Sequence, residues 1–198
     1  TFPNPLVGSV VVYDGEVIGT GWHQKAGEAH AEVLSIRSVS NKSLLADSTL
    51  YVNLEPCSHH GKTPPCTDFI IQSGIRHVVV GMQDPFVKVN GRGIQKLRHA
   101  GVHVDVGIEF AACRELNKRF VTTIEKKRPY IILKWAKTAD GFIAPKTKMT
   151  NEPVWISNLL SRTLAHQWRA EEQSILIGKK KLTMVTAATE LLNEYRYN

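Results

Sequence analysis

Two short stretches of the chain carry side chains that can bind a metal ion and move a proton. Glu55–Cys66 holds two of the three cysteines, and a histidine and a carboxylate stand two residues apart upstream. We expect His30, Cys57 and Cys66 to fill three corners of a zinc tetrahedron, because imidazole and thiolate are usual zinc ligands. The fourth corner is then open for water, as in catalytic zinc sites. Glu32 stays free to transfer protons.

His-x-Glu joined to Pro-Cys and a second cysteine is the pattern of zinc-dependent nucleobase deaminases. Zinc lowers the pKa of its water toward about 7 and so provides hydroxide at neutral pH. We expect attack on a ring carbon that bears an exocyclic amine, while Glu32 takes the water proton and passes it to the departing ammonia. A structural zinc site and an unligated pair of buried cysteines are the alternatives.

The spacing of the two motif cysteines predicts a loop at the mouth of the pocket. Eight residues separate Cys57 from Cys66, whereas the general deaminase pattern has two at this place. The segment carries His59, His60 and Lys62 among prolines, and its lysine favours an anionic partner such as phosphate. The alternative for either histidine is a solvent-facing loop position.

Composition fits a soluble globular protein of one or two domains. The 198 residues are 42% hydrophobic and 22% charged, without a long apolar run, and the three cysteines favour a reducing cytosol over a disulfide framework. The net charge of +7 suits nucleic acid or phosphorylated small substrates, or simply a solvated basic surface. The chain starts at Thr1 without a signal-peptide pattern, so we expect an N-terminal truncation.

Hydrophobic periodicity predicts strands alternating with helices, hence a layered α/β domain with a largely parallel sheet. In such sheets the active site lies beyond the carboxyl ends of the strands, where Glu55–Cys57 and Asp84 fall. His30 and Glu32 can share a pocket only around the first turn of a helix, because residues two apart point about 200° from each other. The expected strands are Val7–Tyr13, Glu16–Trp22, Leu50–Leu54, Arg76–Gln83 and Val102–Val106, and the expected helices are Ala29–Val39, Cys66–Ser73, Gly93–Ala100 and Glu109 to about Glu125.

The character of the chain changes at residues 125–129, which predicts a domain over residues 1–125 and a second part over residues 126–198. In the second part we expect strands at Tyr130–Ala136 and Ser174–Gly178 and a helix at Ser157–Ala170. Two strands and one helix are a thin core for a domain, so this part is expected to be incomplete.

The motifs together closely resemble the bifunctional riboflavin-biosynthesis deaminase–reductase family, and the long segment between the cysteines is specific to that family among zinc deaminases. The matching stretches are Pro3–Gly8, His30–Glu32, Glu55–Cys66 and Asp84-Pro85. The resemblance implies a cytidine-deaminase-like three-layer α/β/α domain that acts on 2,5-diamino-6-ribosylamino-4(3H)-pyrimidinone 5′-phosphate. By position it assigns His30, Cys57 and Cys66 to one zinc ion, Glu32 to proton transfer, and Asn4, His59, Lys62 and Asp84 to the substrate pocket.

The second part resembles the start of the family's reductase domain, which is similar to dihydrofolate reductase and uses NADPH to open the ribose ring of 5-amino-6-(5-phosphoribosylamino)uracil. The resemblance places Lys134 and Asp140 near the substrate, Ala139 and Trp155 near NADPH, and Arg169 near the substrate phosphate. It also implies a cytoplasmic homo-oligomer without nucleic-acid or membrane partners. After Gly178, Lys179–Lys181 and Thr186–Ala188 stand where the family has its cofactor loop.

Two other functions fit parts of the sequence. A deaminase of nucleic-acid bases, for example in transfer RNA, would suit the basic charge, but the eight-residue segment argues against it. A non-catalytic, zinc-stabilised binding module would need the metal ligands but not Glu32.

Overall fold

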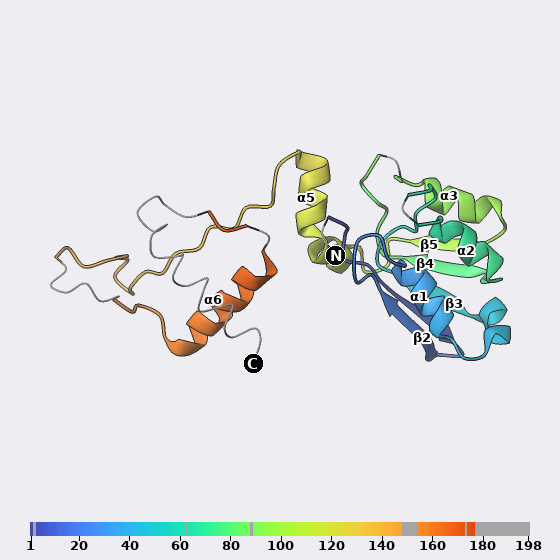
Figure 1. Ribbon diagram of the computed structural model, residues 1–198, viewed down its shortest axis with the longest axis horizontal. Helices are drawn as coiled ribbons and strands as arrows, with labels where there is room; N and C mark the ends of the chain where they lie inside the picture. Colours follow the sequence, from blue (N-terminus) through green and yellow to red (C-terminus); the bar gives the residue numbers. More distant parts are fainter. Residues whose placement is uncertain (2, 62, 88, 148–153, 173, 177–198) are drawn as a thin grey trace. The chain divides into compact units, whose positions relative to one another are not determined.

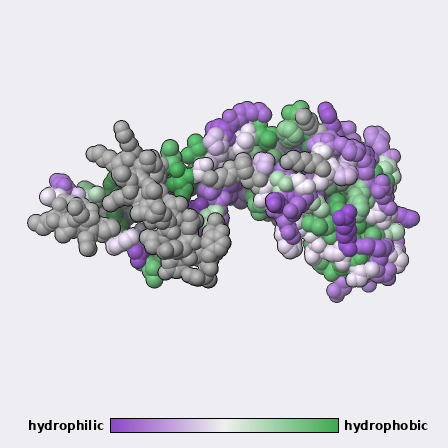
Figure 2. Space-filling model, viewed as in Figure 1, coloured by the Kyte–Doolittle hydropathy of each residue, from purple (hydrophilic) through white to green (hydrophobic). Residues whose placement is uncertain are grey.

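The structure, a computed structural model, describes residues 1, 3–61, 63–87, 89–147, 154–172 and 174–176. It divides into two compact units, Thr1–Ile132 and Leu133–Asn198. Within the described ranges, no helix combines the length and the apolar character needed to cross a membrane. On the face of the first unit drawn in Figure 2, hydrophilic side chains surround scattered hydrophobic ones.

The first unit is built on a five-stranded sheet in the order β2-β1-β3-β4-β5 (Figure 1). The strands are β1 (Gly8–Tyr13), β2 (Glu16–Trp22), β3 (Thr49–Val52), β4 (His77–Val80) and β5 (His103–Val106). β1 is antiparallel to both β2 and β3, whereas β3, β4 and β5 are parallel. The layered α/β domain is confirmed, but the sheet is mixed rather than largely parallel. The reason is the tight turn at Asp14 and Gly15, both at positive φ, which pairs β1 directly with β2.

Helices α1 (Ala31–Ser38), α2 (Cys66–Gln72) and α3 (Arg92–His99) cover one face of the sheet (Figure 1). A short 3₁₀ helix, η1 (Lys42–Asp47), leads from α1 into β3. Inward-facing aliphatic side chains of the strands and helices form one core, because alternate strand residues point to the same face. Its buried members are Val11, Ile36, Val39, Leu45, Leu50, Val52, Ile70, Ile75, Val78, Val80, Ile94, Leu97, Val102 and Val104.

Close packing of α1 on β2 fixes where the motif histidine lies. A Cβ atom at Gly21 would overlap the backbone of Ser35 and Ala31 on α1, so only glycine permits this approach. His30 directly precedes α1 as its N-cap residue, and Glu32 lies in the first helical turn. The histidine and the carboxylate thus meet around a helix start, as the geometry of the motif requires.

The expected single helix from Glu109 to about Glu125 is wrong, because the chain forms α4 (Phe110–Leu116) and α5 (Lys118–Lys126) with Asn117 between them. Asn117 is 2% exposed, and its side chain accepts a hydrogen bond from Leu6 N at 2.8 Å and donates one to Leu6 O at 2.9 Å. Burying an amide without such partners is costly, so this pairing with the N-terminal loop accompanies the helix break.

In the second unit, helix α6 (Leu159–Glu171) confirms the helix expected at Ser157–Ala170. The strand expected at Tyr130–Ala136 is wrong, since those residues form no strand and most of them are exposed. An apolar run forms a strand only where a partner strand pairs with it, and none of the described residues provides one here. Residues 174–176 are irregular, and the remainder of Ser174–Gly178 lies outside the described residues. Among the described residues of this unit, only Ala165 is a buried hydrophobic residue.

Candidate active site

His30, Cys57 and Cys66 converge at one edge of the sheet from three segments that are distant in sequence. Their ligand atoms all lie within 4.8 Å of one another. His30 is the N-cap of α1, and Cys66 is the first residue of α2. Cys57 lies on the segment that follows β3.

The separations of the donor atoms fit a tetrahedral zinc ion. His30 Nδ1 lies 3.1 Å from Cys66 Sγ and 3.6 Å from Cys57 Sγ. Zn–N bonds of about 2.0–2.1 Å and Zn–S bonds of about 2.3 Å separate tetrahedral nitrogen and sulfur ligands by about 3.6 Å. The other ring nitrogen, Nε2, lies 3.4 Å from Thr63 Oγ1. The imidazole therefore turns Nδ1 toward the thiols, and one imidazole with two thiols is a donor set that suits zinc.

The two thiols differ in how readily they ionise. A hydrogen bond from Cys66 and another from His30 lower the pKa of Cys57 to about 4. The same hydrogen bond to Cys57, together with burial, raises the pKa of the Cys66 thiol. The hydrogen bond with Cys57 also raises the pKa of His30. Metal ligation requires deprotonated ligands, so a bound dication would replace the protons on its ligands.

Glu32 lies beside these three residues without belonging to the ligand group. Its side chain is 3% exposed, and burial raises the pKa of its carboxyl group. The carboxyl group also forms a hydrogen bond with Cys66. A buried carboxyl group with a raised pKa, held next to a possible metal-ligand group, is suited to accept and release a proton.

The backbone around the site is held by Glu55, which sequence reasoning did not identify. Glu55 is 4% exposed. Its Oε2 accepts hydrogen bonds from the backbone N–H groups of Asp84 at 3.1 Å and Gly91 at 2.8 Å. Its Oε1 accepts from Gly93 at 2.9 Å and Ile94 at 3.4 Å. One carboxylate therefore joins the end of β3, the loop after β4 and the start of α3. A carboxylate directly after a buried strand was the signal that could have revealed it.

A second residue that sequence reasoning missed is His23, which holds Asn4. His23 is 4% exposed, and its Nδ1 lies 3.2 Å from Ala29 O, which can only accept a hydrogen bond. Nε2 is therefore the acceptor for Asn4 Nδ2 at 2.9 Å. The ring of His23 meets that of His30 edge to face, with centroids 5.2 Å apart. The structure thus brings Asn4 next to the histidine of the ligand group.

Asp84 lies beyond the carboxyl end of β4, as expected. It is 7% exposed, and its Oδ1 accepts a hydrogen bond from Phe86 N at 2.8 Å. Burial raises the pKa of Asp84 to about 6, and the negative charges of Glu55 and Cys57 act in the same direction. This carboxyl group is thus poised to change its charge just below neutral pH.

The remaining predicted deaminase residues lie on the segment between the cysteines. His59 is exposed two residues after Cys57. Lys62 lies outside the described residues, so its position relative to the site stays a prediction.

The residues predicted for the reductase all belong to the second unit. Asp140 lines a cavity of about 380 Å³ together with Thr138, Phe142, Ala144, Pro145, Lys146, Val154 and Ile156. Lys134 and Ala139 are exposed, Trp155 lies 4.2 Å below the guanidinium group of Arg162, and Arg169 stands in the last turn of α6. The described residues therefore do not bring these five predicted residues together around one cavity.

Comparisons with known proteins agree with this geometry. The family model of the cytidine and deoxycytidylate deaminase zinc-binding region matches residues 1–82. The riboflavin biosynthesis protein RibD of Aquifex aeolicus (strain VF5) is 49% identical over 178 residues, which are 90% of this chain and 49% of that protein. RibD of Escherichia coli (strain K12) is 44% identical over 89% of this chain and 47% of its own length.

A solved structure from Thermotoga maritima superposes with a TM-score of 0.82 at 43% identity, over 91% of this chain and 51% of that one. It is a diaminohydroxyphosphoribosylaminopyrimidine deaminase/5-amino-6-(5-phosphoribosylamino)uracil reductase. The predicted cytidine-deaminase-like fold is thereby confirmed. The chain spans about half the length of the relatives it matches.

Glu55→Gln is expected to lower the free energy of unfolding by about 1–3 kcal/mol. The substitution replaces one carboxylate oxygen by an NH₂ group, so the backbone N–H groups that donate to this oxygen lose their acceptor and face a donor instead. Urea denaturation measures the change. Glu16→Gln, on the exposed start of β2, is the matched control. Equal stability of Glu55→Gln and Glu16→Gln would contradict the role given to Glu55.

Asp84→Asn is expected to stabilise the protein at pH 7, because the pKa of Asp84 is about 6 in the folded chain and 3.8 in the reference state. The raised pKa means that the folded state binds the proton more tightly, so the ionised carboxylate destabilises it above pH 6. This cost disappears as the pH falls from 6 toward 4. At about 1.4 kcal/mol per pKa unit, the gain at pH 7 is at most about 3 kcal/mol, and less with a cation bound nearby.

Denaturant unfolding of both proteins at pH 7 and pH 5 tests this, with the exposed Asp47→Asn as control. A stability difference that does not shrink at pH 5 would show that the folded-state pKa of Asp84 is not raised.

Proposed function

We propose that this chain, which belongs to the riboflavin-biosynthesis deaminase–reductase family, carries the zinc-dependent deaminase of that family in residues 1–125. The reaction is hydrolytic deamination of 2,5-diamino-6-ribosylamino-4(3H)-pyrimidinone 5′-phosphate, which consumes water and releases ammonia. The observation that carries the proposal is the convergence of His30, Cys57 and Cys66 beside the buried carboxyl group of Glu32.

In the proposed mechanism, His30, Cys57 and Cys66 hold one zinc ion, which when bound supplies a Lewis acid that activates water. Glu32 takes a proton from the attacking water and delivers it to the departing amine. Burial of Glu32 favours this proton transfer for two reasons. It raises the pKa of the carboxyl group, so that the carboxylate takes up a proton more readily, and the surrounding protein excludes competing water.

In the proposed substrate pocket, Asn4 and Asp84 contact the edges of the pyrimidine ring. His59 and Lys62 contact the rest of the substrate, including its phosphate. Because Asn4 donates its amide hydrogen to His23, its carbonyl oxygen can accept a hydrogen bond from a ring amine. Asp84 accepts when ionised and donates when protonated, and its pKa of about 6 places both forms within reach of working pH.

For residues 126–198 we propose the N-terminal part of an NADPH-dependent reductase domain, dihydrofolate-reductase-like, that reduces 5-amino-6-(5-phosphoribosylamino)uracil in the intact protein. Lys134, Asp140 and Arg169 are its proposed substrate contacts, and Ala139 and Trp155 its proposed cofactor contacts. The support is the match of relatives over about nine-tenths of this chain. A cytoplasmic homo-oligomer without nucleic-acid or membrane partners completes the proposal.

Two observations weigh against the alternatives. A deaminase of transfer RNA bases does not account for the eight-residue segment between Cys57 and Cys66, and activity on free nucleotide but not on RNA would exclude it. A non-catalytic zinc-stabilised module needs the three ligands but gives no reason to bury the carboxyl group of Glu32 beside them.

Glu32→Gln is expected to keep zinc and fold but to lower the rate of ammonia release by about 10²–10⁴-fold, because the amide cannot carry the proton. The assay follows ammonia from the diaminopyrimidinone ribosyl phosphate with and without a zinc chelator, with NADPH oxidation in parallel. Zinc content by elemental analysis is the control. Wild-type activity in a zinc-loaded Glu32→Gln protein would rule out the assigned proton transfer, and no ammonia from zinc-loaded wild type would rule out the proposed deaminase.

Lys62→Ala is expected to raise the KM for the phosphorylated substrate about tenfold with little change in kcat, because a charge-assisted hydrogen bond to phosphate contributes to binding alone. Steady-state kinetics against Lys126→Ala, an exposed lysine on α5, separates a local contact from a general loss of positive charge. An unchanged KM in Lys62→Ala would exclude the phosphate contact.

A further inference from the structure

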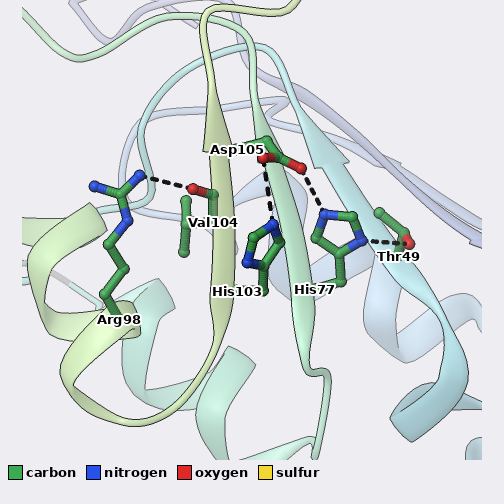
Figure 3. Close-up of polar contacts among 6 residues, drawn as sticks. All are labelled: Thr49, His77, Arg98, His103, Val104 and Asp105. Atoms are coloured by element: carbon green, nitrogen blue, oxygen red, sulfur yellow. Dashed lines mark hydrogen bonds and ion pairs between the residues drawn. The ribbon is translucent and has the colours of Figure 1, made fainter.

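We propose that His77, His103 and Asp105 form a second metal site, selective for a borderline divalent cation such as Zn²⁺, on the sheet face opposite α1, α2 and α3 (Figure 3). The three ligand atoms lie within 4.8 Å of one another. This inference does not depend on the proposed deaminase activity.

Strand geometry places the three side chains together. His77 and His103 are register partners on the parallel strands β4 and β5, and Asp105 follows His103 by two residues on the same face. The residues that follow the two histidines, Val78 and Val104, point into the core and are 0% and 4% exposed. The ligand side chains therefore stand on two hydrogen-bonded strands whose backbone is fixed by the core behind them.

The atom separations are close to those of a metal centre. Asp105 Oδ2 lies 2.8 Å from His77 Nε2, and Asp105 Oδ1 lies 3.3 Å from His103 Nε2. Tetrahedral zinc with bonds of about 2.0–2.2 Å to nitrogen and oxygen separates its ligands by about 3.3–3.5 Å. The separation of His103 Nε2 from Oδ1 already matches, whereas His77 Nε2 contacts the other carboxylate oxygen. Binding through both oxygens, or a rotation of the carboxyl group, would bring both imidazoles to one ion. Two imidazoles and a carboxylate suit zinc, cobalt and nickel.

A hydroxyl group orients one of the imidazoles. Thr49, the register partner of His77 on β3, places its Oγ1 3.2 Å from His77 Nδ1 (Figure 3). With a metal on Nε2, Nδ1 carries the hydrogen and donates it to Thr49, the arrangement that commonly supports histidine ligands.

The site is separate from the first one and open to solvent. His77 and His103 are the first residues of their strands, whereas Asp84 follows the opposite end of β4. The length of β4 alone is about 10 Å at 3.3 Å per residue. The side chains of His103, Asp105 and His77 are 71%, 47% and 38% exposed, so an ion can enter and water can complete the coordination. Bound metal would join the edge strand β5 to β4.

The test is a Zn²⁺ titration of protein already loaded with one zinc per chain, read by competition with a chromogenic chelator. Wild type is expected to bind a second, weaker equivalent that His103→Ala loses and Asp105→Asn weakens at least tenfold. Thr49→Val should weaken it about tenfold, the usual cost of removing a group that supports a ligand. Co²⁺ at the second site should give a visible spectrum without the thiolate charge-transfer bands of the first.

His99→Ala, which removes an exposed histidine of α3 outside the cluster, is the matched control and should keep the second equivalent. Ammonia release by His103→Ala should equal that of wild type, because the residue lies away from the first site. Binding of only one equivalent by wild type, or a second equivalent that survives in both His103→Ala and Asp105→Asn, would overturn the proposal. Loss of the second equivalent in His99→Ala would instead reveal adventitious surface binding and overturn it as well.

Discussion

The acceptance of four backbone N–H groups by the single carboxylate of Glu55 is the interaction on which the active-site edge depends. A carboxylate has room for about four hydrogen bonds, so this one is fully used by the backbone and leaves nothing for solvent or substrate. Gly93 makes the arrangement possible, because a Cβ atom there would overlap Pro56 O and crowd the Glu55 side chain. The loop that presents Asp84 and the turn that presents Cys57 are therefore held by one group.

This rigid edge concentrates negative charge in a small, poorly solvated volume. Glu32, Glu55 and Asp84 are all less than 10% exposed, and Cys57 ionises with a pKa of about 4. Burying several like charges is unfavourable unless something opposite in charge compensates them. Burial raises the pKa of both Glu32 and Asp84, and the negative charge of Cys57 adds to both shifts. A dication bound by His30, Cys57 and Cys66 would offset this negative charge. It would thereby stabilise the same loops that Glu55 holds.

Local motifs in the sequence were sufficient to predict that His30, Cys57 and Cys66 come together, and to predict most elements, because both follow from residue type and short spacing. The missing information was long-range. Nothing near Asn117 in sequence indicates that its amide pairs with Leu6, more than a hundred residues away, and so the break between α4 and α5 was not foreseen. The role of His23 is hidden for the same reason, because the β1–β2 hairpin separates it in sequence from its partner Asn4. The apolar run Tyr130–Ala136 has strand composition, but a strand also needs a neighbour, which composition does not reveal.

The hairpin that makes the sheet mixed also explains why the site lies where it does. Because β1 is antiparallel to both β2 and β3, β2 and β3 run in the same direction, and their carboxyl ends share one edge. Helix α1 follows β2, and α2 follows β3, so both helices begin at that edge, with His30 as the N-cap of α1 and Cys66 as the first residue of α2. A two-residue turn far from the chemistry thus sets the direction of the strands that assemble it.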